Sequence, residues 1–503
     1  MNTINKAYLT LIIFGLFILS NVHSQNKHSN TLHKDCNIPW YFKDFKNDSI
    51  VGISWQKLIS EKSVLEKIDT IIVAVIDTKF DIFHQDIKNQ VWTNKKETKG
   101  NHTDDDGNGY VDDINGWNFL GGKLSNKHIS DSNFESVRIL RKYNDFFNKK
   151  YADTISVSER WKYEQFKLAT NQRAQEIANL KEDLEYGNVL NDRYWIAKDT
   201  VAKIFGNSSY TLKELDSLYQ KTEKENDSVL KPLVYFMRDF VKYDLNEQWI
   251  LEQKSLPLQL EKTSYSQEYD ERYLIGDTLN ELGFKDYGNH EVYNDSITFQ
   301  HAISIAGIIA GQLNCKEEIS GFSEKFKLMP IVVAPTNGDE HDKDIALGIR
   351  YAVDNGAKVI NMSFGKPLSL YKTWVDDALK YAEEKDVLII ASSGNEGKKI
   401  GDNFEHYPDD HNNSSEHEIV SNFVKVGSTS KKINNKLLSS FSNYSKKHVD
   451  LFATGSDIAL LAHQNSYKRS SGTSFSTAIV SGVAAVIRSI YPNLTASQVK
   501  KVF

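Results

Sequence analysis

The sequence predicts an α/β fold: a three-layer domain with a mostly parallel central sheet, interrupted by an α-helical insertion. Beyond residue 325, short β-branched runs alternate with helix-like segments, which is typical of a parallel sheet covered by helices on both faces. Two runs of small and apolar residues, 301–311 and 473–487, predict buried helices. Residues 130–273 are rich in Glu, Lys, Asp, Tyr and Leu at helical spacing, which predicts the insertion.

Length and composition limit the number of domains and the classes of function. The chain has 503 residues, 40% of them hydrophobic, enough for one large domain or two to three ordinary ones. The net charge of -6 is mild and gives no basic face for nucleic acid. Only two cysteines occur, Cys36 and Cys315, and the sequence does not show whether they are close enough to form a disulfide.

Residues 1–24 have the pattern of a cleaved signal peptide. Lys6 precedes the apolar stretch 7–19, and small residues lead to a cleavage position after Ser24. The alternative is a membrane anchor, but the apolar stretch is short for a span, and no later run looks long enough to cross a membrane. We expect an exported protein, extracellular or periplasmic, with no transmembrane segment after signal cleavage.

Residues 25–69 form an N-terminal extension, for which we expect a loop and one amphipathic helix over 54–67 that packs on the main domain. The β-branched run 70–77 then predicts a central strand buried on both faces, ending at Asp77. A carboxylate at the carboxyl end of such a strand lies where α/β folds place their sites. The alternative is a side chain that caps the following turn.

A polar segment after this strand resembles a calcium-binding loop. Asp104, Asp106, Asn108 and Asp112 place carboxyl or amide oxygens at alternating positions, and a glycine stands sixth in the loop. Asn115 replaces the glutamate that would close such a loop. The sequence therefore leaves two interpretations open, a structural calcium site and a plain Asp/Asn/Gly turn.

Three further polar residues stand at element ends. His301 begins one buried helix, Ser474 begins the other, and Asn395 follows the strand expected at 387–391. Each has an ordinary structural role open to it, as a packed histidine, a helix cap or a turn former. Each also has a chemical one, because a serine nucleophile needs a base, an orienting carboxylate and donors for the oxyanion. Asp77 supplies the carboxylate in the chain order Asp, His, Ser.

The remaining elements support the fold class. The insertion contains no catalytic constellation, and the chain stops within an expected helix, which suggests a short or truncated C-terminus. The other expected strands and helices are 326–333, 343–355, 356–365, 370–384, 423–427 and 449–452.

At this point the sequence resembles the subtilisin-like serine proteases (subtilases), of the secreted bacterial type with a helical insertion between the Asp and His motifs. The motifs that carry the resemblance are Val73-Ala74-Val75-Ile76-Asp77-Thr78, His301 with Ala306-Gly307-Ile308-Ile309-Ala310, Val359-Ile360-Asn361-Met362-Ser363-Phe364-Gly365, Ser393-Gly394-Asn395-Glu396-Gly397 and Gly472-Thr473-Ser474. It covers residues 70–120 and 287–503. The resemblance implies a peptidase domain made of 70–129 and 274–503, with the insertion at 130–273.

The resemblance also implies roles. Ser474 matches the nucleophile, His301 the general base and acid, and Asp77 the group that orients the imidazole. Asn395 matches the oxyanion-hole side chain. Residues Ser363, Phe364 and Gly365 match an edge that binds the substrate backbone as an added strand and borders the first specificity pocket.

Several positions depart from the family pattern. Lys79 replaces a glycine, Ile303 and Ser304 replace polar residues after the histidine, Phe475 replaces a methionine, and Thr454 replaces a proline. Ala302 and Ala478 are milder changes, since alanine is a good helix former. None removes a catalytic group, yet together they suggest weakened or unusually specific activity.

Two hypotheses follow. The first is a secreted serine endopeptidase that cleaves polypeptides through an acyl-enzyme and requires no cofactor for chemistry, with calcium in a structural role. The second is a catalytically impaired subtilase fold that acts as a protein-binding module. The sequence predicts neither the cleavage preference nor the oligomeric state.

Overall fold

The computed structural model describes residues 38–123, 127–150, 154–278, 281–283, 286–293, 301–401, 404–411 and 417–503. The expected signal peptide and Cys36 lie outside the described residues, whereas Cys315 is disulfide-bonded. The chain divides into two compact units. One contains Thr170–Tyr269, and the other contains the rest of the described residues.

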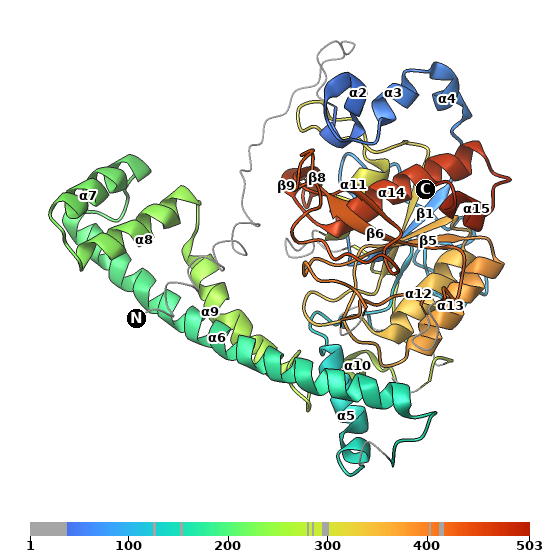
Figure 1. The fold of residues 1–503 in the computed structure, drawn as a ribbon, viewed down its shortest axis with the longest axis horizontal. Helices are drawn as coiled ribbons and strands as arrows, with labels where there is room; N and C mark the ends of the chain where they lie inside the picture. The colour runs from blue at the N-terminus through green and yellow to red at the C-terminus, as the bar shows by residue number, and fades with distance from the viewer. Residues whose placement is uncertain are drawn as a thin grey trace. The chain divides into compact units, whose positions relative to one another are not determined.

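The larger unit is built on a seven-stranded sheet in which every neighbouring pair is parallel (Figure 1). The strand order is β2-β3-β1-β4-β5-β6-β7, so β1 (Ile72–Asp77) lies inside the sheet. The other strands are β2 (Trp117–Asn118), β3 (Lys327–Val332), β4 (Val359–Met362), β5 (Leu388–Ser392), β6 (Phe423–Thr429) and β7 (Leu451–Thr454). The predicted fold class is confirmed.

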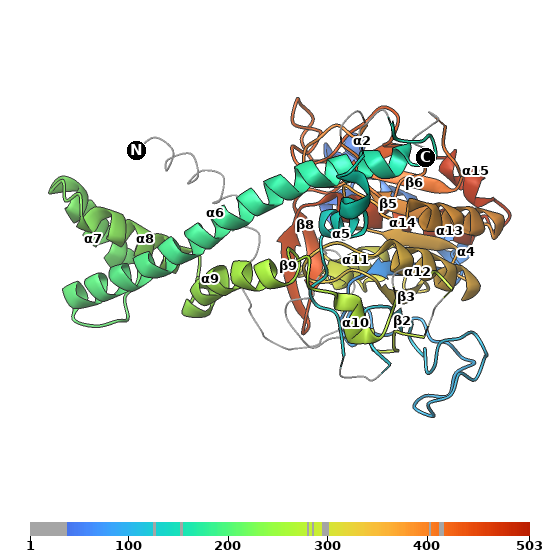
Figure 2. The ribbon, with the colours of Figure 1, turned by 90° about the horizontal axis from the view of Figure 1, so that it is seen from below.

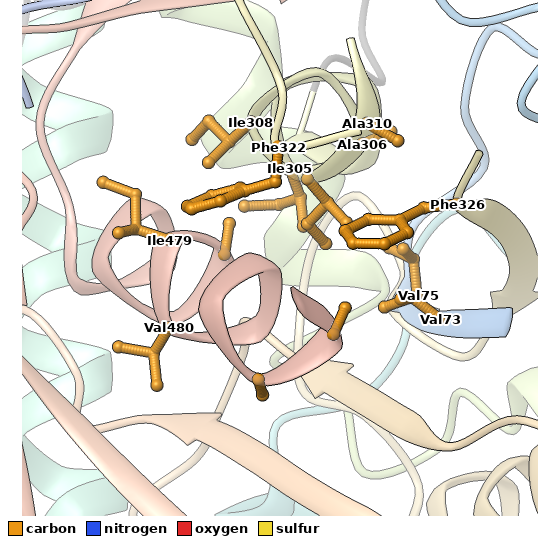
Figure 3. Close-up of a cluster of buried hydrophobic side chains, with 14 of the residues drawn as sticks. Val73, Val75, Ile305, Ala306, Ile308, Ala310, Phe322, Phe326, Ile479 and Val480 are labelled. Carbon is orange, nitrogen blue, oxygen red and sulfur yellow. The ribbon is translucent and has the colours of Figure 1, made fainter. Parts of the chain in front are cut away.

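Helices cover both faces of this sheet (Figures 1 and 2). Because successive strand residues point to opposite faces, Val73 and Val75 pack with α11 (His301–Ala310) and α14 (Thr473–Ile490). Ala74 and Ile76 pack with α12 (Asp342–Asp354) and α13 (Lys372–Glu384) on the other face. Figure 3 shows the first core, with Ile305, Phe322 and Ile479 packed together.

Glycines allow the two buried helices to approach their neighbours closely. A Cβ on Gly307 of α11 would lie 2.5 Å from Leu461 Cγ, and Gly482 of α14 lies against the ring of Phe322. Helix α14 is long and apolar enough to cross a membrane by length and composition, contrary to the expectation from the sequence, but 78% of it is buried inside the structure. It is the core helix that carries Ser474.

The remaining elements of this unit were predicted less well. The hairpin of β8 (Ile458–Ala462) and β9 (Ser466–Ser470) was not expected. The single helix expected over 54–67 is wrong: it is divided into α3 (Trp55–Ile59) and α4 (Lys62–Lys67), with the break at residues 60–61. The extension also contains η1 (Trp40–Phe42) and α2 (Phe45–Asp48), and the chain ends in α15 (Ala496–Lys500).

The N-terminal extension packs on the side of the larger unit that contains α11 and α14. Phe42 and Trp55 lie against Phe322, with ring centroids 5.0 and 5.2 Å away. The Tyr41 hydroxyl donates a hydrogen bond to the Ser320 carbonyl at 3.2 Å. These aromatic contacts belong to the same hydrophobic core as α11 and α14.

The smaller unit is helical, and the bounds 130–273 of an insertion stay a prediction. Helix α6 (Arg160–Phe205) continues into it, followed by α7 (Leu212–Lys224), α8 (Leu230–Lys242) and α9 (Glu247–Lys262). It has a hydrophobic core of its own, to which Tyr194, Leu215, Val234 and Ile250 contribute. Helices α5 (Glu135–Phe147) and α10 (Glu271–Ile275) belong to the larger unit.

Candidate active site

The structure brings Asp77 and His301 together. Asp77 ends β1 and is fully buried, while His301 begins α11 on the neighbouring helical layer. The imidazole Nδ1 lies 2.8 Å from Asp77 Oδ1 and 2.9 Å from Oδ2. The Thr78 N–H donates to the same Oδ1 at 2.7 Å, which fixes the carboxylate. The carboxylate therefore sets the orientation of the ring and its tautomer, with the proton on Nδ1.

The charge of Asp77 also raises the pKa of the imidazole. Burial alone lowers the pKa of His301, but the attraction and hydrogen bond of Asp77 outweigh it, so the pKa is raised above 6.5. The side chain is 37% exposed, so Nε2 is within reach of a substrate. A ring held this way accepts a proton more readily than a free histidine.

Ser474 occupies the first turn of α14, where unpaired backbone N–H groups and the helix dipole favour negative charge. Its side chain is 7% exposed. The hydroxyl donates a hydrogen bond to the Ser363 carbonyl at 2.9 Å. Among the described residues, no hydrogen bond joins Ser474 to His301. Such contacts are often loose without substrate, so rotation about one side-chain bond would have to redirect the hydroxyl.

Asn395 follows β5 and is held by the residue before Ser474. Its Oδ1 accepts hydrogen bonds from the Thr473 backbone N–H at 2.9 Å and from the Thr473 hydroxyl at 3.0 Å. With the oxygen fixed, the amide nitrogen Nδ2 faces away from Thr473 and forms no hydrogen bond within the described residues. The side chain is exposed. It can therefore donate to an oxyanion that forms beside Ser474.

Ser363, Phe364 and Gly365 directly follow β4 beside this pair. The Ser363 hydroxyl lies 3.0 Å from the Ser474 carbonyl, and the Ser392 hydroxyl donates to the Phe364 carbonyl at 3.2 Å. Within the described part of the chain, no hydrogen bond engages the backbone N–H or C=O of Gly365. This backbone is half-buried and can pair with an extended peptide.

A buried network of ion pairs holds Lys366, the residue that follows Ser363–Gly365. Lys366 Nζ lies 3.0 Å from Glu135 and 2.9 Å from Asp342, and it donates to the Glu340 carbonyl at 2.7 Å. Burial lowers the pKa of Lys366, but the two carboxylates outweigh it and raise the pKa, so the amine stays charged. Sequence reasoning missed this network because Glu135 lies 231 positions from Lys366 and no local pattern connects them.

The departures from the family pattern are accommodated by packing. The Ser304 hydroxyl donates to the Leu461 carbonyl of β8 at 2.8 Å, and Ile303 is fully buried in the core. The Phe475 ring centroid lies 6.4 Å from that of His301, so Phe475 forms one side of the base's surroundings. The Lys79 side chain is buried, and burial lowers its pKa. These residues occupy positions around the site without displacing Asp77 or His301.

The four predicted metal ligands are only partly brought together. Asp104 and Asp106 gather with Glu97, and one oxygen of each lies within 4.8 Å of the others. The Asp112 carboxylate accepts the backbone N–H groups of Gly100 and His102 at 2.7 and 3.0 Å and is not part of this cluster, so its sharing of a site with Asp104 stays a prediction. These two hydrogen bonds hold the turn at residues 100–102 against Asp112.

Asn108 is also used within the loop. Its Oδ1 accepts the Tyr110 N–H at 2.7 Å, and its Nδ2 donates to Asp113 at 3.1 Å. Glu97 joins Asp104 and Asp106 in the cluster, and sequence reasoning missed it because it lies before the loop, outside the alternating pattern. Three carboxylates are a chemically suitable set for calcium, which prefers oxygen ligands.

A parallel sheet with an acid at one strand end, and with a histidine and a serine at the starts of two buried helices, is an arrangement used by one class of serine hydrolases, those with the chain order Asp, His, Ser. Comparison with known proteins agrees: the sequence model of the subtilase family matches residues 262–503. The chain is 30% identical over 222 residues to Subtilisin DY of Bacillus licheniformis, a match that covers 44% of this chain and 75% of that protein. The chain belongs to the subtilase family.

Two other relatives are longer. The chain is 32% identical over 231 residues to Subtilisin-like protease 3 of Plasmodium falciparum (isolate 3D7), covering 44% of this chain and 29% of that protein. It is 35% identical over 229 residues to the Cell wall-associated protease of Bacillus subtilis (strain 168), covering 45% of this chain and 23% of that protein. The chain thus matches less than a third of each of these two relatives.

Proposed function

We propose that this protein is a serine endopeptidase, with Ser474 as nucleophile, His301 as general base and acid, Asp77 as the orienting carboxylate and Asn395 as an oxyanion donor. The observation that carries the proposal is the Asp77–His301 contact at 2.8 and 2.9 Å. Family membership supports it.

The chemistry follows from these positions. The Ser474 Oγ attacks the peptide carbonyl carbon while its proton passes to His301 Nε2, and Asp77 stabilises the imidazolium. The oxyanion accepts hydrogen bonds from Asn395 Nδ2 and the Ser474 backbone N–H. Collapse breaks the C–N bond, and the leaving amine takes the proton from His301. Water then attacks the acyl-enzyme by the same steps, which releases the acid and restores Ser474.

We infer that the substrate is a polypeptide bound in extended form along Ser363–Gly365. The free backbone groups of Gly365 support this inference. The exported location expected from residues 1–24 belongs to the same proposal, as does the secreted bacterial type.

Calcium enters the proposal only as a structural ion. Glu97, Asp104 and Asp106 would hold it through carboxylate oxygens. When bound there, the ion would stabilise the loop between β1 and β2, and no step of the chemistry passes through it.

The second candidate, a binding module without catalysis, rests on the direction of the Ser474 hydroxyl, which points to the Ser363 carbonyl. Purified protein incubated with casein separates the two. The endopeptidase proposal expects internal cleavages that Ser474→Ala abolishes, and the binding-module hypothesis expects intact casein with both proteins. A folded wild-type protein that leaves casein and a mixed peptide library intact, with and without calcium, contradicts the endopeptidase.

A further inference from the structure

We propose that Asp409, His411 and His448 form a transition-metal site, distinct from the carboxylate cluster at Glu97. The first two lie on the segment between β5 and β6, and His448 lies just before β7. One ligand atom from each lies within 4.8 Å of the others. The site has no role in the proposed chemistry, since none of its residues contacts Asp77, His301 or Ser474 through a hydrogen bond within the described residues.

The distances fit a small metal ion. His411 Nδ1 lies 3.1 Å from Asp409 Oδ1, and His448 Nδ1 lies 3.3 Å from Asp409 Oδ2. A tetrahedral ion with bonds of about 2.0–2.1 Å places its ligands roughly 3.3 Å apart. Both imidazoles therefore present Nδ1 to the carboxylate at the spacing of neighbouring ligands. Two nitrogen ligands favour Zn²⁺ or a similar ion over calcium.

Asp410 offers a fourth ligand group beside the cluster. Asp410 Oδ1 also lies 3.1 Å from His411 Nδ1. Asp410 is 4% exposed, yet its Oδ2 is buried without a hydrogen bond, with only the Lys500 amine 3.8 Å away. The Lys500 amine compensates the charge of this carboxylate but is too far away to form a hydrogen bond, so the buried Oδ2 can still accept a ligand contact.

The carboxylate of Asp409 is held in place by a backbone N–H group and by a lysine outside the cluster. Its Oδ1 accepts the His411 backbone N–H at 2.7 Å, and its Oδ2 accepts Lys425 Nζ at 3.0 Å. The two imidazoles remain 11% and 17% exposed, so an ion can enter from solution. Supporting contacts of this kind are what hold a ligand ready for a metal.

Zn²⁺ titration of the metal-free full chain, followed by calorimetry, tests this site, with Co²⁺ as a spectroscopic probe. We expect one site per chain, a visible Co²⁺ spectrum of nitrogen ligation and a raised melting temperature. His448→Ala should weaken binding by more than the roughly 10–100-fold that losing a supporting group costs. His290→Ala, a change at an exposed histidine elsewhere, should bind like wild type.

The result that overturns the site is a wild-type protein with no stoichiometric Zn²⁺ uptake, or one whose uptake His448→Ala leaves unchanged. The imidazoles would then only hydrogen-bond Asp409. If His448→Ala does not fold, the wild-type Co²⁺ spectrum decides alone, because ligation by oxygen only also contradicts the proposal.

A different observation carries a second inference, which rests on the proposed function: we infer that His406 fills the first specificity pocket and restricts it to small side chains. A Cβ added to Gly365 would lie 2.6 Å from His406 Nε2, and one added to Gly394 would lie 2.6 Å from His406 Cδ2. The ring therefore lies against both glycines. Gly365 belongs to the substrate edge, and Gly394 precedes Asn395.

The family resemblance places the first specificity pocket beside Ser363–Gly365, so the substrate side chain on the acyl side of the scissile bond would lie next to Gly365. The His406 ring lies against Gly365 and against Gly394, the residue before Asn395. His406 is 3% exposed, and its Nδ1 has no hydrogen-bond partner within the described residues. The Lys366–Tyr407 backbone pair, at 3.0 and 2.8 Å, anchors the ring's segment to the edge.

Peptides that differ only at the residue on the acyl side of the cleaved bond test the inference. We expect wild type to prefer Gly, Ala or Ser over Phe by at least about tenfold in kcat/KM. His406→Gly should remove or reverse this preference, and His290→Gly should keep it.

Wild-type protein that reacts with a fluorophosphonate but prefers Phe overturns the inference about His406 alone. Wild-type protein that does not react contradicts the proposed function instead. If His406→Gly does not fold, the wild-type preference decides.

Discussion

Thr473 holds Asn395 in the orientation that the proposed chemistry needs, so Thr473→Val should weaken catalysis. The substitution keeps the side-chain shape and removes one hydroxyl. In the structure that hydroxyl donates to Asn395 Oδ1 at 3.0 Å, and the Thr473 backbone N–H donates to the same oxygen at 2.9 Å. The variant therefore loses one of the two bonds that fix the amide.

The size of the effect follows from that single bond. A neutral hydrogen bond contributes about 0.5–1.5 kcal/mol. If the transition state loses this much stabilisation, kcat falls by about 2–13-fold, since 1.36 kcal/mol corresponds to tenfold. KM should stay nearly unchanged, because the oxyanion forms only in the transition state. Asn395→Ala, which removes the donor itself, should lower kcat by about 10²–10³-fold.

Kinetics with a fluorogenic peptide check this, beside the matched variant Thr477→Val. Thr477 lies on the same helix and its hydroxyl donates to the Thr473 carbonyl at 2.8 Å, so the variant makes the same chemical change without touching Asn395. Equal kcat values for Thr473→Val and Thr477→Val would refute the reasoning, as would a loss confined to KM.

Three further predictions concern charge and stability. Asp77 raises the pKa of His301 above 6.5, and the proposed base must be neutral, so kcat/KM should fall as the pH drops through a midpoint above 6.5. Asp77→Asn should move this midpoint to lower pH. A midpoint that stays in place would argue against the role of Asp77. Asp344→Ala removes a carboxylate that lies 2.6 Å from the buried guanidinium of Arg272. The free energy of unfolding, measured in urea, should fall by about 3–5 kcal/mol, because the variant leaves a buried charge without a main partner. A fall of less than about 1 kcal/mol would contradict this account. Asp104→Ala should abolish any melting-temperature rise that calcium gives the wild type, and a rise of equal size in both proteins would place the ion elsewhere.

Most of the sheet could be predicted from the sequence because its inner strands, such as β1, β4 and β5, are buried on both faces. A continuous β-branched run such as 70–77 is typical of a buried parallel strand, above all in a chain where such runs alternate with helices. The hairpin β8–β9 was missed, since its second strand, Ser466–Ser470, is polar and mostly half-exposed and has no apolar alternation. The break between α3 and α4 was missed because the apolar spacing over 54–67 continues across residues 60–61, where the chain leaves the helix.

The site was predicted where its residues stand at element ends, and missed where distant side chains meet. Asp77, His301 and Ser474 each mark the end of a strand or the start of a buried helix, so the topology brings them to the same region. Glu97 and His406 stand in loops, and no spacing rule connects them to their neighbours. Only the folded chain shows that Glu97 joins the acidic cluster and that the His406 ring lies beside Gly365.

The central claim is that Ser474 is an activated nucleophile, and labelling with a fluorophosphonate tests it most directly. The account predicts one label per chain, located on Ser474 by peptide mass spectrometry, and no label on folded Ser474→Ala or His301→Ala. A folded wild-type protein that remains unlabelled, or a His301→Ala variant that is labelled equally well, would contradict it.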